Sequence, residues 1–371
     1  MSDTTQVSRQ LHERARAWIA SYEAGTAPTE TFDAFSVAVA SYQFDANPHF
    51  RKLCDKRGVG VAQGFERLPG IPTSAFKHAR IACFSPSETT KTFQTSGTTI
   101  GDPGSHAFRD VGTYDRGAVA FGRTMLLGGF EKTPKVLTFG LSPALAPASS
   151  LTHMCSLFAD RLGSIPSTDA FFLDEAGVFD LVRFDACVTS SLMQEEPVLV
   201  LGTSFSFVHL LDALGDDKLP LPAGSRVMQT GGFKGKSREV DAGTLRKQIA
   251  NAFSIPETHV VSEYGMTELS SQFYDEVLPS YPNRRLYRCP PWARVVPVHE
   301  DTLLPVPVGE VGIARIEDLL NIDSACILLT EDRVRKVDAS LDHFELLGRL
   351  PGAAPRGCSI AIDELIGSDD R

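Results

Sequence analysis

The sequence lacks the cysteine patterns that signal a disulfide framework or a zinc site. Its 7 cysteines, at positions 54, 83, 155, 187, 289, 326 and 358, are scattered and include no Cys-x-x-Cys pair. An odd number without regular spacing is typical of reduced thiols in a cytoplasm. The sequence therefore favours a cytoplasmic enzyme.

Long apolar runs and excess positive charge are also missing. No run approaches the roughly 18–20 apolar residues of a membrane span, and the polar start has no signal-peptide core. A net charge of −10 argues against nucleic-acid partners and against docking on anionic membranes. A nucleotide stays possible because local donors decide its binding. With 371 residues, 42% of them hydrophobic, the chain suits a globular enzyme of two to three domains.

Strand and helix patterns alternate through the middle of the chain. We predict strands over 135–140, 197–202, 225–232 and 258–262, and helices over 8–24, 29–45, 113–127, 204–214 and 238–253. This alternation predicts an α/β fold with a largely parallel sheet. Short β-like runs broken by prolines predict a β-rich subdomain over 285–350. The predicted parts are a helical segment packed on the core (1–60), an α/β core (61–284), the β-rich subdomain (285–350) and a short tail carrying Cys358 (351–371).

Residues 95–105 (TSGTTIGDPGS) are the most informative stretch that is present. Glycine allows a close backbone approach, and hydroxyl and N–H groups suit anionic oxygens, so the composition indicates a phosphate cradle. Residues 92–94 are predicted to end a strand just before it. No lysine follows the second glycine, so this is not the P-loop of NTPases. A flexible surface turn of the same composition is an equally good interpretation.

Three later segments also suit a nucleotide. Residues 231–236 (GGFKGK) would let backbone lie against a base, or form a tight turn before a helix. In residues 262–268 (SEYGMTE), Tyr264 would stack on a purine, Thr267 would donate to a phosphate and Glu268 would hold Mg²⁺. The alternative is that Thr267 and Glu268 cap a following helix. Residues 329–332 place a carboxylate after a strand, where ribose hydroxyls are commonly bound, or form an ordinary turn.

Taken together, these segments resemble the adenylate-forming superfamily, and most closely the acyl-protein synthetase (LuxE) family. The resemblance runs from about residue 35 to 366 and rests on segments 42–49, 71–77, 95–99, 230–235, 264–268, 330–332, 348–349 and 356–359. It implies the large N-terminal domain of these enzymes, with mixed, largely parallel sheets and flanking helices, and the β-rich subdomain. It also implies activation of a carboxylic, typically fatty, acid by ATP to an acyl-adenylate. An enzyme cysteine then takes the acyl group as a thioester and delivers it to a partner such as an acyl reductase.

The resemblance assigns roles to individual residues. The nucleotide would be bound by Thr95, Ser96, Gly97, Thr98, Thr99, Gly231, Gly232, Phe233, Tyr264, Gly265, Thr267, Asp332 and Arg349, with Mg²⁺ on Glu268. Cys358, Glu268, Thr267 and Arg349 would be the catalytic set. The acid pocket would include His153, Gly202, Thr203 and Phe205. A core histidine at 153 and plain core phenylalanines are equally good interpretations.

The chain departs from the superfamily in its lysines. The phosphate loop has none, and only residues 350–371 follow Arg349, so we expect the usual small C-terminal domain and its lysine to be absent. Mg²⁺, Lys234, Lys236, Arg349 or Arg356 would replace that charge. The difference makes CoA transfer less favoured.

Cys358, beside Arg356, suits the acyl acceptor because nearby positive charge favours the thiolate. The partner would be an acyl-CoA- or aldehyde-forming reductase, an acyltransferase or an acyl carrier protein. An acyl- or aryl-CoA ligase with a reduced tail, or a non-catalytic scaffold, are the alternatives.

Overall fold

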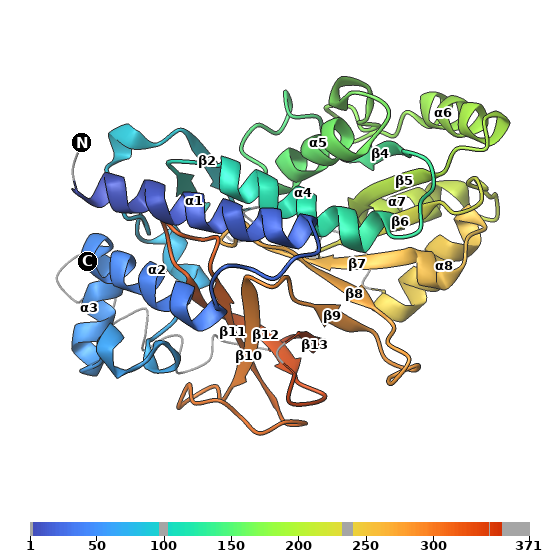
Figure 1. Ribbon diagram of the computed structural model, residues 1–371. Coiled ribbons are helices and arrows are strands. Elements are labelled where there is room, and N and C mark those ends of the chain that lie inside the picture. The colour runs from blue at the N-terminus through green and yellow to red at the C-terminus, as the bar shows by residue number, and fades with distance from the viewer. Residues whose placement is uncertain (1–2, 96–102, 232–239, 341, 351–371) are drawn as a thin grey trace. The chain divides into compact units, whose positions relative to one another are not determined.

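The computed structural model describes residues 3–95, 103–231, 240–340 and 342–350 (Figure 1). The chain divides into two compact units, each described by itself. Unit 1 comprises Met1–Ala120, Met266–Phe273 and Arg285–Arg371, and unit 2 comprises Phe121–Gly265 and Tyr274–Arg284. The chain passes between them within helix α4 (Gly112–Leu127) and strand β8 (Phe273–Glu276).

Unit 1 begins with three helices, and the caps of the second and third set where they start. These are α1 (Asp3–Glu23), α2 (Phe32–Ala46) and α3 (Pro48–Arg57). The Thr31 hydroxyl accepts from the backbone N–H of Ala34, which starts α2 three residues later than the predicted helix over 29–45. Asn47 caps α3 in the same way, followed by a proline in the first turn, where its missing N–H costs nothing. The sequence analysis did not predict α3.

The strands of unit 1 confirm the predicted β-rich region. β9 (Leu286–Arg288), β10 (Ala293–Val298), β11 (Val311–Asp318), β12 (Ile327–Arg335) and β13 (His343–Arg349) pair antiparallel in the order β10-β11-β12-β13-β9. The short strand β1 (Ile71–Pro72) joins β12 in parallel. A separate hairpin is formed by β2 (Lys91–Gln94) and β3 (Ser105–Phe108). Between these elements lie single 3₁₀ turns at Val61–Gln63, Phe65–Arg67, Thr73–Lys77 and Pro86–Glu88.

Unit 2 contains the parallel sheet that the alternation predicted. β4 (Lys135–Phe139), β5 (Val198–Thr203), β6 (Arg226–Thr230) and β7 (Val260–Tyr264) are parallel neighbours in that order. The helices of this unit are α5 (Ser150–Leu162), α6 (Leu181–Met193), α7 (Ser204–Leu214) and α8 (Ala242–Phe253), with 3₁₀ turns at Ser167–Asp169 and Glu257–His259. The sequence analysis did not predict α5 or α6. All four predicted strands are confirmed.

Phenylalanines dominate the core of unit 2. Phe139, Phe184, Phe207 and Phe253 are at most 1% exposed and meet edge-on or tilted around the sheet. Aromatic pairs in this geometry add to the free energy gained by burial. The core therefore fixes the strands whose carboxyl ends carry several predicted site residues. Among the described residues, no helix is long and apolar enough to cross a membrane.

Candidate functional site

The hairpin of unit 1 carries the glycine- and threonine-rich loop. The predicted strand over 92–94 is β2, and its partner β3 begins at Ser105. At the neck of the loop the N–H of Thr95 donates to the Gly104 carbonyl at 2.8 Å, and the N–H of Gly104 donates to the Thr95 hydroxyl at 2.9 Å. Ser96, Gly97, Thr98 and Thr99 lie outside the described residues. Thr95 and Gly104 thus close the end of the hairpin.

The neck of this loop is bonded to Thr267, the residue predicted to donate to a phosphate. The His106 ring, on β3, donates from Nδ1 to the Thr267 carbonyl at 2.8 Å. The Thr267 hydroxyl donates to the carbonyl of Gln94, on β2, at 3.4 Å. Two segments separated by about 170 residues of sequence therefore meet within unit 1. The helix-capping alternative for Thr267 is wrong, because a turn and then strand β8 follow it.

His106 is a site residue that the sequence analysis missed. It is 1% exposed and lies between Phe76 and Phe108, with ring centroids 5.6 and 4.2 Å away. Burial lowers the pKa of His106 to about 4, although the bond to Thr267 acts against the shift. The ring is therefore neutral at physiological pH, with its proton on Nδ1. An isolated histidine in a short strand gives no sequence pattern that would have identified it.

Glu268 follows Thr267 and is 8% exposed. Its backbone carbonyl accepts a hydrogen bond from the Asn321 side chain at 2.8 Å. Among the described residues no three His, Cys, Asp or Glu side chains cluster as metal ligands. A single well-held carboxylate fits Mg²⁺, since this ion usually takes one or two carboxylates and completes its shell with substrate phosphates and water.

The two residues predicted to contact ribose are cross-strand neighbours. Asp332 on β12 pairs in register with Arg349 on β13. Arg349 Nε lies 3.6 Å from Asp332 Oδ1, and the arginine side chain is 67% exposed. The backbone N–H of Asp332 donates to the Thr330 hydroxyl at 3.0 Å. The antiparallel register of two consecutive strands brings this carboxylate and guanidinium together.

Unit 2 gathers other predicted residues at the carboxyl ends of parallel strands. Thr203 on β5 is in register with Thr230 on β6, and Thr230 is in register with Glu263 on β7. Gly231 and Tyr264 directly follow these positions, and Gly231 has a φ of 72°, which favours glycine. Gly232 and Phe233 lie outside the described residues. Carboxyl ends of parallel strands are where nucleotides commonly bind.

Glu263 is a second residue that the sequence analysis did not assign. It is 6% exposed and accepts a short hydrogen bond from the Thr230 hydroxyl. Burial raises the pKa of Glu263 to about 7, although the Thr230 bond acts against the shift. A Cβ at Gly265 would come within 2.3 Å of Glu263 Oε1, so the carboxylate occupies the space that a side chain there would need. Gly265 is thus explained by the packing of Glu263.

The residues predicted for the acid pocket have structural partners in unit 2. The Thr203 hydroxyl caps α7 by accepting from the backbone N–H of Ser206 at 2.9 Å. Gly202 leaves room for the Phe207 ring, which a Cβ would approach to 3.0 Å. Phe205 is half-buried, and its ring meets His209 edge-on at 4.4 Å. His153 is half-buried in the first turn of α5. Their part in an acid pocket stays a prediction.

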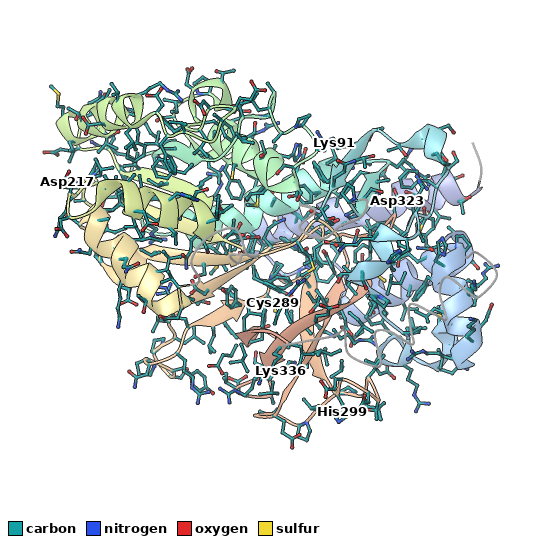
Figure 2. All side chains as sticks on the ribbon, turned by 180° about the vertical axis from the view of Figure 1, so that it is seen from behind. Lys91, Asp217, Cys289, His299, Asp323 and Lys336 are labelled. Carbon is teal, nitrogen blue, oxygen red and sulfur yellow. The ribbon has the colours of Figure 1, made fainter. Side chains whose placement is uncertain are left out.

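The six cysteines of the described residues are free thiols. Five of them are buried, and Cys187 is half-buried. Burial raises the pKa of Cys54 and of Cys289 to about 12, and the pKa of Cys155 is also raised by burial. Cys289 lies among the strands of unit 1, where the charge of Lys336 opposes its shift (Figure 2). A buried thiol with a raised pKa is a poor nucleophile. Cys358 lies outside the described residues.

Comparisons of the sequence with known proteins point to one family. The family model for acyl-protein synthetase, LuxE, matches residues 15–366. The long-chain-fatty-acid–luciferin-component ligase of Vibrio harveyi is 22% identical over 338 residues, covering 87% of this chain and 85% of that protein. The ligase of the same name from Aliivibrio fischeri is 20% identical over 342 residues, covering 88% and 86%.

Comparison with solved structures shows the fold. An open conformation of 2-hydroxyisobutyryl-CoA ligase in complex with 2-HIB-AMP and CoA matches with a TM-score of 0.61 at 16% identity, covering 87% of this chain and 75% of that chain. The same ligase in its thioesterification state matches with a TM-score of 0.59 at 17% identity, covering 86% and 67%. The chain therefore has the adenylate-forming ligase fold that the resemblance implied.

Proposed function

This chain belongs to the acyl-protein synthetase (LuxE) family, and from that premise we propose that it loads a fatty acid onto its own Cys358. The acid is first activated by ATP to an acyl-adenylate. The acyl group then moves to the cysteine as a thioester and from there to a partner protein. The long-chain fatty acid named for the two ligases it resembles is the acid class we propose here.

One observation carries the activation step. The neck of the threonine-rich loop is bonded to Thr267 through Gln94 and His106 within unit 1. The strands β2 and β3 that flank this sequence of hydroxyl-bearing residues are thus bonded to Thr267, which precedes Glu268. This combination suits the α- and β-phosphates of ATP, because donors and a metal-binding carboxylate neutralise the charge that develops there. We propose that Tyr264 lies on adenine and that Asp332 and Arg349 bind the ribose.

In the activation step, an oxygen of the fatty carboxylate attacks the α-phosphorus of ATP. The bond from that phosphorus to the bridging oxygen breaks, and diphosphate leaves with the electron pair. The Thr267 hydroxyl would turn from the Gln94 carbonyl to donate to the α-phosphate, and neutral His106 keeps the Thr267 backbone in place. Glu268 would hold Mg²⁺, which when bound supplies charge neutralisation for the phosphates.

In the transfer step, the Cys358 thiolate attacks the acyl carbonyl, and AMP leaves from the mixed anhydride. The five described cysteines that are buried have little access to such an acyl group. Cys358 follows Arg356 and Gly357 in the sequence, and a neighbouring guanidinium favours the thiolate form. For the onward step we propose a reductase, an acyltransferase or an acyl carrier protein as the acceptor. Free thiols throughout the described chain support a reducing, cytoplasmic compartment.

The test of this function is acyl labelling of the purified protein. Wild type, Cys358→Ser and the control Cys187→Ser are incubated with Mg·ATP and radiolabelled fatty acids of several lengths. We expect wild type and Cys187→Ser to carry label that neutral hydroxylamine releases. We expect Cys358→Ser to form acyl-adenylate and release diphosphate yet carry less than about a tenth of that label, since only its acceptor is missing.

The other outcomes contradict separate parts of the proposal. Equal labelling of Cys358→Ser would remove the cysteine assignment. AMP formation with label on CoA instead of protein would make the chain an acyl-CoA ligase. No AMP formation with any acid tested would leave a non-catalytic scaffold.

A further inference from the structure

Glu268 lies in a stretch of backbone that has no regular structure of its own. Residues 265–272 form neither helix nor strand. Within this stretch the backbone N–H of Leu269 donates to the Met266 carbonyl at 3.1 Å. Without a helix or a strand ladder, the position of this backbone depends on side chains that bond to it from elsewhere.

Those side chains come from the end of β11 and from the connection between β11 and β12. The Asn321 amide donates to the Glu268 carbonyl at 2.8 Å, and its oxygen accepts from the Ser270 hydroxyl at 3.2 Å. Asp318 accepts from the Ser270 N–H and from the Ser271 hydroxyl, each at 2.7 Å. All of these residues belong to unit 1. These hydrogen bonds therefore fix the backbone of Glu268 and the two serines at 270 and 271.

Asn321 is itself held rigidly. Its amide also donates to the Ala325 carbonyl at 2.9 Å, its backbone carbonyl accepts from the Gln43 side chain at 2.8 Å, and it is 2% exposed. Gln43 reaches two more positions on the same connection, Ile322 at 2.8 Å and Cys326 at 2.9 Å. The family-like segment 42–49 thus has a structural explanation: its polar side chains fasten this connection.

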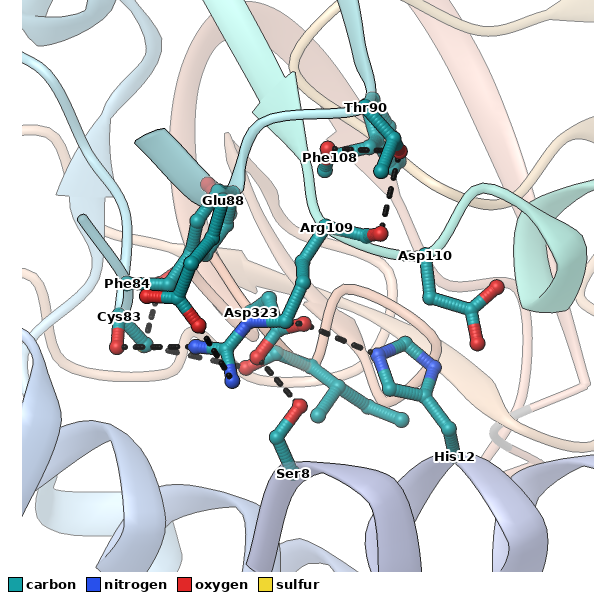
Figure 3. Close-up of polar contacts among 12 residues, drawn as sticks. Ser8, His12, Cys83, Phe84, Glu88, Thr90, Phe108, Arg109, Asp110 and Asp323 are labelled. Carbon is teal, nitrogen blue, oxygen red and sulfur yellow. Dashed lines mark hydrogen bonds and ion pairs between the residues drawn. The ribbon is translucent and has the colours of Figure 1, made fainter. Parts of the chain in front are cut away.

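The far side of the connection is fastened by a buried carboxylate, Asp323 (Figure 3). Ser8 donates to Asp323 Oδ1 at 2.8 Å and the Tyr42 hydroxyl donates to the same atom at 2.7 Å. His12 Nε2 lies 3.1 Å and Arg109 Nε 3.8 Å from Oδ2. The bonds to Asp323 therefore hold the connection between β11 and β12 in place, and Asn321 on the same connection bonds to the backbone of Glu268.

We infer that Asn321 is a positioning residue for the magnesium-binding carboxylate. It acts through the backbone of Glu268 and touches neither metal nor nucleotide. This inference rests on the proposed function, because it takes Glu268 as the metal ligand. Partners that orient a metal ligand typically contribute 10–100-fold to metal affinity or activity.

The test compares Asn321→Leu with Gln43→Met. The leucine is close in size to asparagine and removes both donors without adding charge. The methionine removes the Gln43 bonds to the same connection without touching Glu268. Calorimetry measures the Kd for Mg²⁺ at a saturating concentration of a non-hydrolysable ATP analogue, and diphosphate exchange gives kcat and KM. Each variant is compared at equal folded fraction, and Asn321→Ser is a milder second variant.

We expect the Mg²⁺ Kd of Asn321→Leu to rise about 10–100-fold and that of Gln43→Met to stay within about threefold of wild type. kcat should fall at limiting Mg²⁺ and partly recover at high Mg²⁺. An unchanged Mg²⁺ Kd in a folded Asn321 variant overturns this inference alone. An equal rise in Gln43→Met also overturns it, because general loosening would then suffice. A wild type that binds no Mg·ATP analogue overturns the proposed function and this inference with it.

Discussion

Two buried carboxylates, one in each compact unit, are held in opposite ways. Asp323 in unit 1 is 7% exposed and receives hydrogen bonds from Ser8 and Tyr42, with His12 and Arg109 beside its other oxygen. Although burial raises it, these bonds and charges hold the pKa of Asp323 below its usual range. Glu263 in unit 2 is similarly buried at 6%. Its described hydrogen-bond donor is the Thr230 hydroxyl, and its pKa is raised to about 7.

Because the two side chains are almost equally buried, their hydrogen-bond donors and charged neighbours account for the difference in pKa. Hydrogen-bond donors and the Arg109 guanidinium replace the water that Asp323 loses, so its ionised form is stable and ties α1 and α2 to the connection between β11 and β12. Within the described part of the chain, Glu263 has one hydroxyl donor in place of water, so ionising it opposes folding. In unit 1 the ionised carboxylate of Asp323 therefore stabilises the fold. Unit 2 places a carboxylate that titrates near neutral pH directly before Tyr264.

The largest effect is expected from Asp323→Ala. Removing one partner of a buried ionic network takes away the buried charge beside Arg109 and the acceptor of the Ser8 and Tyr42 hydroxyls, so the free energy of unfolding should fall by about 3–5 kcal/mol at pH 7. Denaturant melts measure it. Because the folded pKa of Asp323 is depressed, its contribution should be present above its unfolded pKa and lost as pH falls through the folded pKa.

The control is Asp217→Ala, at an exposed position in unit 2 (Figure 2). It should change the free energy of unfolding by less than about 0.5 kcal/mol. Asp323→Asn keeps the shape of the side chain and serves if the alanine variant does not fold. A loss no larger than that of Asp217→Ala would mean that the Asp323 network contributes nothing to stability.

Glu263→Gln should have an intermediate effect of the opposite sign. The folded pKa of about 7 lies above the ordinary value of 4.5, so ionisation makes wild type less stable as pH rises from 4.5 to 7. The neutral amide avoids this cost. We expect the variant to be about 1–3 kcal/mol more stable at pH 8 and nearly unchanged at pH 5, by urea melts.

Glu175→Gln, at an exposed position in the same unit, is the matched control. It should give nearly the same urea midpoint as wild type at both pH values. Equal destabilisation of Glu263→Gln at pH 5 and pH 8 would show that the carboxylate is not the titrating group and would end the comparison with Asp323.

Thr230→Val should have the smallest effect. It removes the hydroxyl that donates to Glu263 while keeping the side-chain volume, so the carboxylate loses a bond to its ionised form. We expect a loss of about 1–2 kcal/mol at pH 8 and an upward shift of the Glu263 pKa, followed by ¹³C NMR of the labelled carboxyl. Thr230→Ser retains the hydroxyl and should restore both. If valine and serine behave alike, packing at Thr230 matters and the hydrogen bond does not.

Local patterns in the sequence were enough for the strands and for several site segments. Alternating apolar and helical stretches predicted β4, β5, β6 and β7, since a buried strand needs only a short apolar run bounded by turns. The glycine- and threonine-rich loop and residues 264–268 were predicted as site segments because their composition suits nucleotide binding and would be poor in a core. Helices α5 and α6 were missed because apolar stretches near strands do not distinguish the two structures.

What the sequence by itself determined is the family and the kind of chemistry, and it supplied the segments that we propose take part, because these depend on residue type and order. Only the tertiary structure decided that His106 and Gln94 bond to Thr267 and that Asn321 bonds to the backbone of Glu268. It also decided that the pKa of Glu263 is raised and that of Asp323 is lowered. Each of these depends on contacts between residues far apart in the chain. The pKa of a group and the position of a backbone segment depend on such neighbours, so a local sequence pattern does not predict them.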